Sequence, residues 1–302
     1  MPSSPPPSPD ATPDRREGDR RRRLIHEAYG TGARIRLLGD APGFGGNVVV
    51  VDLDDGPQHC RLLGTFRAAS DSPPGTDRGV IALSVMDLIS PSRLVLHYEQ
   101  LMSLALALCA RPATALLLGV GGAAMWRFLR AHLPACTTTL VEKDATIEVI
   151  ARRWFYLDQP VVIDSGEHFL AGTTGHFDAI LADLNDAHGS LLPAPEVWAH
   201  CLDALAPGGC LATNWPDHAT NGGVRPSAEA QAALARARGH DCFFIARRGL
   251  ADNIVQYVCA AEGRGPAALA GALGRLATEH GLPDGDRILE DCIVSPAFPV
   301  AG

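Results

Sequence analysis

The stretch from residue 115 to residue 279 alternates strand patterns with helix patterns, and this alternation limits the fold more than any other feature. The apolar run Ala115–Leu118 is unbroken, as is typical of a strand buried on both faces. A glycine-rich turn follows, and then a helical pattern with Met125, Phe128, Leu129 and Leu133 on one face. Repetition of this unit predicts a Rossmann-like α/β fold, in which a mostly parallel sheet carries helices on both faces.

Further strands and helices continue the alternation. The predicted strands cover residues 138–141, 161–163, 177–182, 210–213, 241–246 and 253–260. The last two have little chain between them, so we expect a terminal hairpin with one antiparallel member. The predicted helices cover residues 98–110, a segment capped by Asp144, 195–206, 227–238 and 265–279.

The chain before residue 98 has a different character. Residues 1–23 are rich in Pro, Ser and Arg and are expected to form a disordered tail. Short β-type runs punctuated by Gly and Pro then predict a small N-terminal β domain over residues 24–97. We expect the catalytic domain to span 98–280 and a C-terminal tail to span 281–302.

The turn after the first buried strand reads Gly119-Val120-Gly121-Gly122, and it opens a helix. Glycines let a ligand approach the backbone, and the helix N-terminus offers unpaired N–H groups, so Gly119, Gly121 and Gly122 are predicted to bind a cofactor. Glu142 ends the next strand, about 20 residues further on, where an acid accepts hydrogen bonds from ribose hydroxyls. Together these features predict a nucleoside ligand without specifying which one.

Two acids follow the strand at 177–182, in the run Asp183-Leu184-Asn185-Asp186. The carboxyl ends of parallel strands share one edge, so both acids are expected beside the glycine turn. There they can hold an ammonium group or accept its proton. Tyr98 and Gln100 open the helix that leads into the core, and we predict that Tyr98 orients the substrate amine and that Gln100 contributes to substrate binding.

Composition narrows the function further. The formal net charge of −8 argues against a nucleic-acid partner and suits a cationic ligand. Eight cysteines occur without a C-x-x-C pair, which favours buried thiols over a metal site, so we expect no metal. No apolar stretch is long enough for a membrane span or a secretory signal, and a cytoplasmic location is expected.

The order of these features resembles the spermidine synthase family. The residues that carry the resemblance are Tyr98, the glycine turn 119–122, Val141-Glu142-Lys143-Asp144, and the paired-Asp motif formed by Asp183 and Asp186. The resemblance covers roughly residues 33–260 and implies an S-adenosylmethionine-dependent transferase fold. It also implies a polyamine-biosynthesis enzyme, an aminopropyltransferase, that moves an aminopropyl group from decarboxylated S-adenosylmethionine to a polyamine or another amine.

The resemblance implies roles for individual residues. Asp183 deprotonates the attacking amine, Asp186 binds the cationic nitrogens of the polyamine, and Tyr98 helps to place the amine. Glu142 holds the ribose. The family reads the adenine with an Asp that is replaced here by Ser165, and Asp164 is expected to compensate. Family members are dimers or tetramers, so we expect a homodimer.

Departures from the family pattern keep other functions open. The family's glycine turn carries an Asp that helps to hold the amine of the donor, whereas this chain has Gly122 or Ala123 there. That change favours an S-adenosylmethionine-dependent methyltransferase as the main alternative. A nicotinamide dehydrogenase, from the G-x-G-x-x-A pattern alone, and a non-catalytic binding protein are the others.

Overall fold

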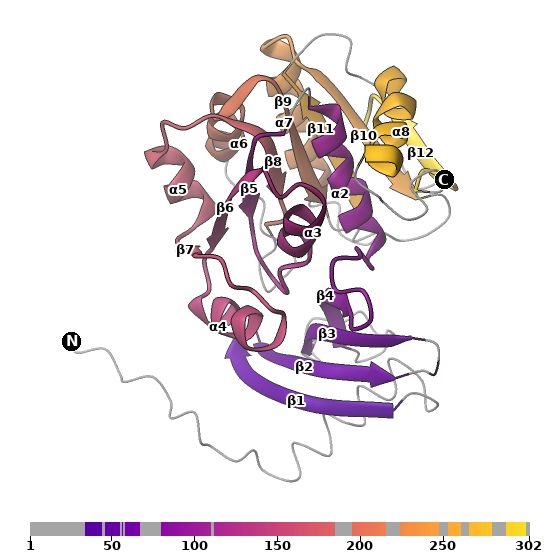
Figure 1. Cartoon of the computed structure of the whole chain (residues 1–302). Coiled ribbons are helices and arrows are strands. Elements are labelled where there is room, and N and C mark those ends of the chain that lie inside the picture. Colours follow the sequence, from indigo (N-terminus) through magenta and orange to yellow (C-terminus); the bar gives the residue numbers. More distant parts are fainter. Residues whose placement is uncertain are drawn as a thin grey trace, which may run out of the picture.

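The computed structural model describes two β-sheets with helices packed around the larger one (Figure 1). The residues described are 34–43, 46–54, 56, 58–66, 80–109, 112–184, 195–215, 224–247, 253–260, 266–279 and 288–299. The predicted disordered tail, residues 1–23, lies outside them.

The smaller sheet is antiparallel and has the strand order β1-β2-β3-β4. Its strands are β1 (Arg34–Gly43), β2 (Gly46–Asp54), β3 (His59–Phe66) and β4 (Val80–Asp87). Successive side chains of a strand point to opposite faces, so the valine run of β2 supplies two clusters. Val48 and Val50 join one cluster, and Val49 and Val51 join the other. The predicted small N-terminal β unit is thereby confirmed.

The larger sheet has eight strands in the order β12-β10-β11-β9-β8-β5-β6-β7. Strands β5 to β9 pair in parallel, while β11 is antiparallel to both β9 and β10. This arrangement confirms the predicted mostly parallel sheet with a terminal antiparallel hairpin. The bounds are β5 (Thr114–Leu118), β6 (Thr137–Glu142), β7 (Val162–Ile163), β8 (Phe177–Ala182), β9 (Leu205–Trp215), β10 (Asp241–Arg247), β11 (Ile254–Cys259) and β12 (Cys292–Ser295).

Strand β12 lies in the stretch that we expected to be a C-terminal tail. It pairs antiparallel with β10, from Phe244↔Ser295 to Arg247↔Cys292, and so adds an edge strand to the sheet. Four residues are too few for an alternation of apolar and polar side chains to predict a strand. The strand forms because β10 offers a free edge for pairing.

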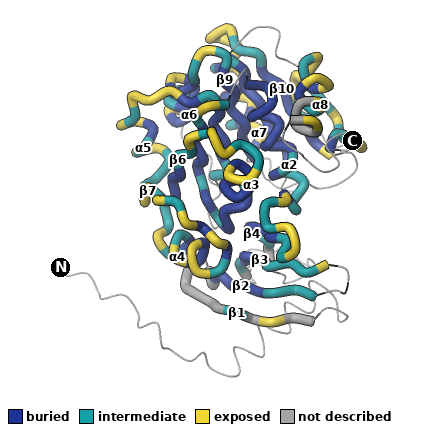
Figure 2. Tube along the Cα trace, viewed as in Figure 1, coloured by how far each residue is buried: buried dark blue, intermediate teal, exposed yellow. Residues whose placement is uncertain are grey.

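Helices cover both faces of the larger sheet. They are α2 (His97–Leu108), α3 (Ala124–His132), α4 (Ala145–Trp154), α5 (Gly166–Gly172), α6 (Pro195–Asp203), α7 (Val224–Ala237), the 3-10 turn η1 (Pro266–Ala268) and α8 (Leu269–Glu279). Alternate strand residues feed two separate cores. Leu117 and Leu140 pack with α2 and α3, whereas Leu116 and Val141 pack with α6 and α7. The dark interior of Figure 2 is this double core.

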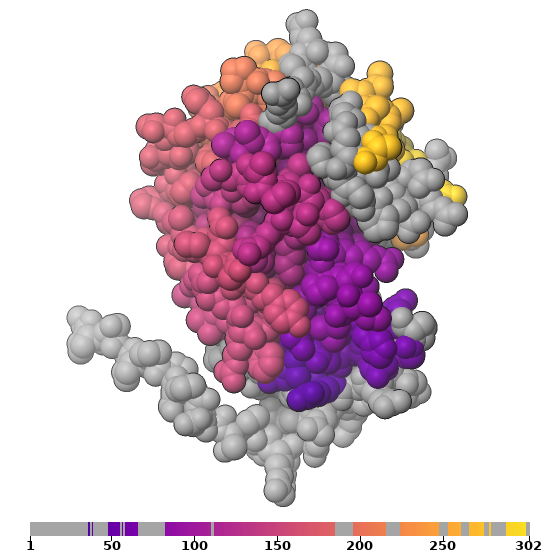
Figure 3. All heavy atoms as spheres, in the orientation of Figure 1, coloured from indigo at the N-terminus to yellow at the C-terminus, as the bar shows by residue number. Residues whose placement is uncertain are grey.

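Helix α4 joins the two sheets. Ile147, Ile150 and Phe155 share a buried cluster with Val50 of β2 and Met86 of β4. Figure 3 shows the pink atoms of this part of the chain directly against the indigo and purple atoms of the smaller sheet. The two parts therefore share apolar surface, and the domain boundary predicted near residue 97 remains a proposal.

No helix among the described residues combines the length and the apolar character that crossing a bilayer requires.

Candidate functional site

Five neighbouring strands of the larger sheet end with a polar or glycine residue at the same edge. Asn214 lies near the end of β9, Asp183 follows β8, and Gly119 follows β5. Glu142 ends β6 and Asp164 follows β7. The strand order reverses between β8 and β5, and ligands of open α/β sheets bind at such a reversal.

The glycine turn packs directly on the acid of the neighbouring strand. Gly119 has φ +89°, and a Cβ built there would lie 2.3 Å from the carbonyl oxygen of Asp183, so only glycine fits. Backbone bonds continue the sheet on both sides, from Gly119 N–H to the Val141 carbonyl and from Asp183 N–H to the Leu118 carbonyl, each at 2.9 Å. The turn and Asp183 are thus parts of one rigid edge.

The carboxylate of Glu142 lies against the same turn. Its Oε2 accepts hydrogen bonds from the N–H groups of Val120 at 3.0 Å and Gly121 at 3.4 Å. Its Oε1 accepts from the N–H of Asp144 at 3.1 Å, and the side chain is 9 % exposed. A carboxylate has about four lone-pair sites, and these bonds occupy three of them, so Oε1 keeps acceptor capacity for a hydroxyl group.

Asp183 is held by two donors that come from distant parts of the chain. The Tyr98 hydroxyl donates to Oδ2 at 3.2 Å, and the Asn214 carboxamide donates to Oδ1 at 2.8 Å. Burial and then the neighbouring Asp183 raise the pKa of Tyr98 well above its usual value. Tyr98 therefore keeps its proton and acts as a donor to Asp183.

A second carboxyl, Glu99, is buried beside Asp183 with only 4 % of its surface exposed. Burial and the charge of Asp183 raise its pKa to about 8. Hydrogen bonds from the Leu96 N–H and the Ser84 hydroxyl, together with the charge of Arg127, oppose this rise only in part. Glu99 is consequently mostly uncharged at neutral pH and adds no full negative charge beside Asp183.

Gly122 has no space for a side chain. A Cβ there would lie 2.7 Å from both side-chain atoms of Ser84 and 3.2 Å from the ring of Phe155. The guanidinium of Arg127 donates to the Gly122 carbonyl, to the Phe155 carbonyl at 2.9 Å and to the Pro91 carbonyl at 2.8 Å. Burial lowers the pKa of Arg127 to about 10, so it stays charged. The residues packed around the turn therefore leave no room for an acidic side chain at position 122.

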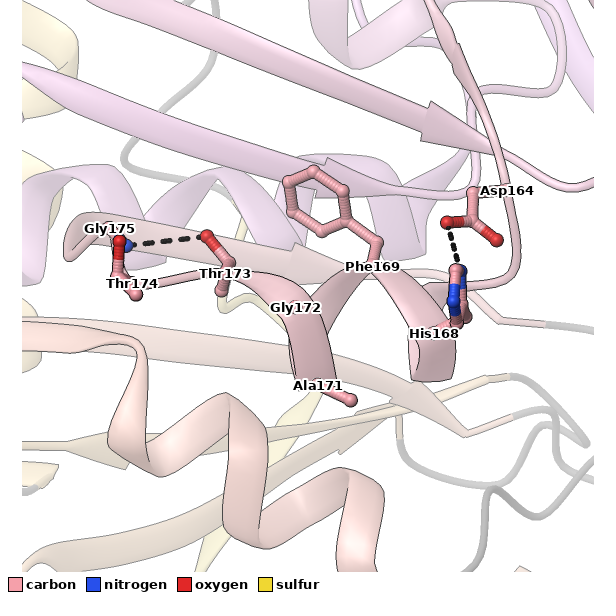
Figure 4. A pocket seen from close by; sticks show the side chains of 8 residues that line it. All are labelled: Asp164, His168, Phe169, Ala171, Gly172, Thr173, Thr174 and Gly175. Carbon is pink, nitrogen blue, oxygen red and sulfur yellow. Dashed lines mark hydrogen bonds and ion pairs between the residues drawn. The ribbon is translucent and has the colours of Figure 1, made fainter.

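Asp164 and Ser165 lie at the start of α5. Asp164 pairs with His168 Nδ1 at 2.7 Å, and the Ser165 hydroxyl caps the helix by accepting from the His168 N–H at 3.1 Å. Asp164 also borders an open hollow of ≈ 590 Å³ along α5. Figure 4 shows its lining residues, which are Asp164, His168, Phe169, Ala171, Gly172, Thr173, Thr174 and Gly175. None of them belongs to the glycine turn.

Of the two predicted substrate-binding residues, Gln100 and Asp186, only Gln100 lies among the described residues. The Gln100 side-chain amide donates to the Leu94 carbonyl at 2.9 Å. Gln100 lies two residues after Tyr98, and such a spacing puts side chains on different sides of a helix. Asp186 lies outside the described residues.

The sequence predictions missed Asn214 and gave no role to Glu99 and Ser84. A polar residue near the end of an apolar strand was the available signal for Asn214, because strand ends at this edge carry ligand residues. No sequence signal marks Ser84, since its position opposite Gly122 results from packing between β4 and the turn. Among the described residues no group of His, Cys, Asp or Glu side chains is arranged to hold a metal.

The sheet order, the glycine turn and the acid on β6 define the class of this protein, which has the Rossmann-like fold of S-adenosyl-type transferases. The chain is a distant relative of the spermidine synthases, the polyamine aminopropyltransferases, and the resemblance drawn from its motifs is confirmed. No protein-family model matches the chain.

The supporting similarities come from sequence and from structure. A polyamine aminopropyltransferase of Chromobacterium violaceum is 31% identical over 139 residues, which are 44% of this chain and 53% of that protein. A Drosophila melanogaster homologue of the eEF1A lysine and N-terminal methyltransferase is 32% identical over 114 residues, 33% of this chain and 17% of that protein. The chain therefore spans about half or less of the curated relatives that it matches.

Solved structures share the fold over most of the chain. A probable spermidine synthase from Corynebacterium glutamicum has a TM-score of 0.60 at 20% identity, covering 83% of this chain and 92% of that one. A spermidine synthase in complex with the transition state analogue AdoDATO has a TM-score of 0.61 at 14% identity, covering 87% of this chain and 86% of that one.

Proposed function

We propose that this chain transfers an aminopropyl group from decarboxylated S-adenosylmethionine to a polyamine or another amine. The observation that carries the proposal is the setting of Asp183. Its carboxylate is held by Tyr98 and Asn214, and its backbone packs against the glycine turn at Gly119. An oriented carboxylate beside a nucleoside-type turn is the group that such a transfer needs to hold an amine and accept its proton.

The donor fits the groups along the edge. The remaining lone-pair site of Glu142, on Oε1, suits a ribose hydroxyl. Asp164 and Ser165, at the end of the neighbouring strand, are proposed to contact the adenine. The turn formed by Gly119, Gly121 and Gly122 lets the donor approach the backbone.

The reaction is a single displacement. The lone pair of the amine forms a bond to the carbon beside sulfur, the carbon–sulfur bond breaks, and the sulfonium becomes a neutral thioether. Asp183 accepts the proton that the new ammonium group loses, and the Tyr98 hydroxyl keeps this carboxylate oriented. Asp186 is proposed to bind a further cationic nitrogen of the acceptor. Positioning supplies most of the rate, since a sulfonium is already a good leaving group.

The test compares donor binding with turnover. Calorimetry measures binding of the donor, and release of methylthioadenosine with a panel of polyamines measures transfer. We expect Asp183→Asn to bind the donor as the wild type does and to lower kcat by about 10²–10⁴-fold.

A matched control lies at the opposite end of the same strand. Asp178 accepts from the backbone N–H groups of Ala113 and Thr114, far from the edge, so Asp178→Asn is expected to keep kcat. Failure of the wild-type protein to release methylthioadenosine with every amine tested would rule out aminopropyl transfer.

Methyl transfer from intact S-adenosylmethionine is a second candidate, favoured by one feature of the site. The turn carries no acid at Gly122, and Ser84 fills the space into which a side chain would point. The absence of an acid at this position suits a donor that bears a carboxylate. In addition, one of the curated relatives is named a methyltransferase homologue. Calorimetry with both donors decides, because tighter binding of the intact donor, with methylated amine as product, supports this candidate.

The expected homodimer, the cytoplasmic location and the absence of a nucleic-acid partner stay predictions. Light scattering of the purified protein, which gives its molar mass in solution, checks the expected homodimer.

A further inference from the structure

The buried carboxyl of Glu99 has no part in the proposed transfer, although it lies next to two parts of the site. The residue is 4 % exposed, and its Oε2 accepts from the Leu96 N–H at 3.4 Å. The Ser84 hydroxyl also donates to this carboxyl, and the same hydroxyl oxygen lies 2.7 Å from where a Cβ of residue 122 would be. Glu99 is thus one hydroxyl group away from the glycine turn, and the charge of Asp183 acts on it.

The charged groups around Glu99 explain why its carboxyl is protonated. Among the described residues, the charges that act on it are the carboxylate of Asp183 and the guanidinium of Arg127, which is engaged with three carbonyl groups. Tyr98, its titratable neighbour on α2, keeps its proton. Burial is the larger cause of the raised pKa of Glu99, and the charge of Asp183 is the second. This second cause depends on whether a cation lies beside Asp183.

The donor of the proposed reaction is such a cation. It carries a sulfonium, and the carbon next to its sulfur has to meet the amine that Asp183 holds. We propose that Glu99 is a second anionic group of the site, which becomes charged only when the cationic donor occupies the place beside Asp183. Donor binding is then coupled to the release of a proton from Glu99 to the solvent. This inference rests on the proposed function, since it requires a cationic donor at this edge of the sheet.

The coupling has a definite sign and size. A positive charge near Glu99 favours its anionic form and lowers its pKa, whereas burial remains and limits the fall. With the pKa of Glu99 at about 8, a coupling of about tenfold releases about half a proton per donor bound at pH 7.5. Because the linkage is reciprocal, the affinity for the donor should increase by about sixfold from about pH 6.5 to about pH 8.5.

Calorimetry in HEPES and in Tris at pH 7.5 counts the released protons, because the two buffers differ in ionisation enthalpy. Decarboxylated S-adenosylmethionine is the cationic probe, and methylthioadenosine, which has the same nucleoside and a neutral thioether, is the control ligand. For the wild type we expect release of about half a proton with the first and almost none with the second. Glu99→Gln is expected to abolish the release, whereas Glu196→Gln, at an exposed position on α6, is expected to keep it.

A spectroscopic measurement covers the case in which Glu99→Gln fails to fold. The C=O stretching band of a protonated carboxyl is separate from the carboxylate bands, so infrared difference spectra follow Glu99 in the wild type itself. We expect this band to decrease when decarboxylated S-adenosylmethionine binds and to stay unchanged with methylthioadenosine.

The outcomes separate this inference from the proposed function. Donor binding and transfer without proton release and without loss of the band, or a release that persists in folded Glu99→Gln, overturns the inference and leaves the proposed function intact. Failure of the wild type to bind the donor and to transfer to any amine removes the proposed function, and the inference with it.

Discussion

Several residues at this edge of the sheet are fixed by lack of space or by lack of solvent. Gly119 has no room for a Cβ because Asp183 occupies that space, and Gly122 has none because of Ser84. Glu99 is kept uncharged by burial and by Asp183. The sequence identified the glycines and Asp183, because turn chemistry and strand ends are local signals. It did not identify Glu99, whose burial depends on β4 and on α3 packing around it.

The buried Glu99 carboxyl makes the stability of the protein depend on pH. The folded protein holds the Glu99 proton up to a pH of about 8, whereas the unfolded chain releases it near its usual pKa of about 4.3. Stability of the wild type therefore decreases as the pH rises between these two values. Glu99→Gln does not titrate, so its unfolding temperature is expected to rise relative to the wild type from pH 5 to pH 8. Thermal unfolding followed by circular dichroism measures the difference.

Among the described residues, the groups beside Glu99 are the carboxylate of Asp183, the Leu96 N–H, the guanidinium of Arg127 and the hydroxyls of Ser84 and Tyr98. The substitution leaves all of them in place. Glu196→Gln, at an exposed position on α6, is the control and is expected to follow the wild type at each pH. Parallel curves for Glu99→Gln and the wild type would contradict a buried, protonated carboxyl.

At the scale of elements, the site depends on how β4 and α3 close around the turn. Arg127 of α3 bonds three carbonyl groups that belong to separate segments, at Pro91, Gly122 and Phe155. Ser84 of β4 fills the space beside Gly122. Periodicity predicted α3, but it predicted neither the strand β4 nor this contact. A register between a strand of one sheet and a turn of another leaves no pattern in the sequence.

A double-mutant cycle tests this contact. Gly122→Ala is expected to cost about 1–3 kcal/mol, because the added methyl overlaps Ser84 in a closely packed place. Ser84→Gly opens the space, so the double variant should recover part of that cost as a coupling free energy. Chemical denaturation gives the three values. Gly172→Ala is the control, since a Cβ there meets nothing within 4 Å, and additive costs at positions 84 and 122 would disprove the overlap.

At the scale of the whole molecule, the two sheets share one apolar cluster through α4. Ile150 is 7 % exposed and packs with residues of β2 and β4. Arg61 of β3 adds a bond to the Trp154 carbonyl at 2.7 Å and pairs with Asp52 at 2.6 Å. The N-terminal sheet is thus attached to the larger unit through buried contacts as well as through the chain.

This attachment predicts a single unfolding transition. Ile150→Ala removes buried methyl groups from the shared cluster and is expected to lower the free energy of unfolding by about 2–5 kcal/mol. Tryptophan fluorescence, to which Trp154 contributes from the shared cluster, and far-ultraviolet circular dichroism should then shift together. Two separate transitions, of which the substitution moves only one, would show that the sheets unfold independently.

The sequence by itself determined the alternation of strands and helices, the parallel sheet with its terminal hairpin, the glycine turn and the acids at the strand ends. These features rest on periods of two and 3.6 residues and on turn chemistry, all of which act over short stretches of chain. Only the tertiary structure decided that Tyr98 and Asn214, 85 and 31 residues from Asp183 in the chain, both donate to it. It also placed Ser84 opposite Gly122 and added β12 to the sheet edge. Such contacts depend on the packing of whole elements against one another, which no local pattern records.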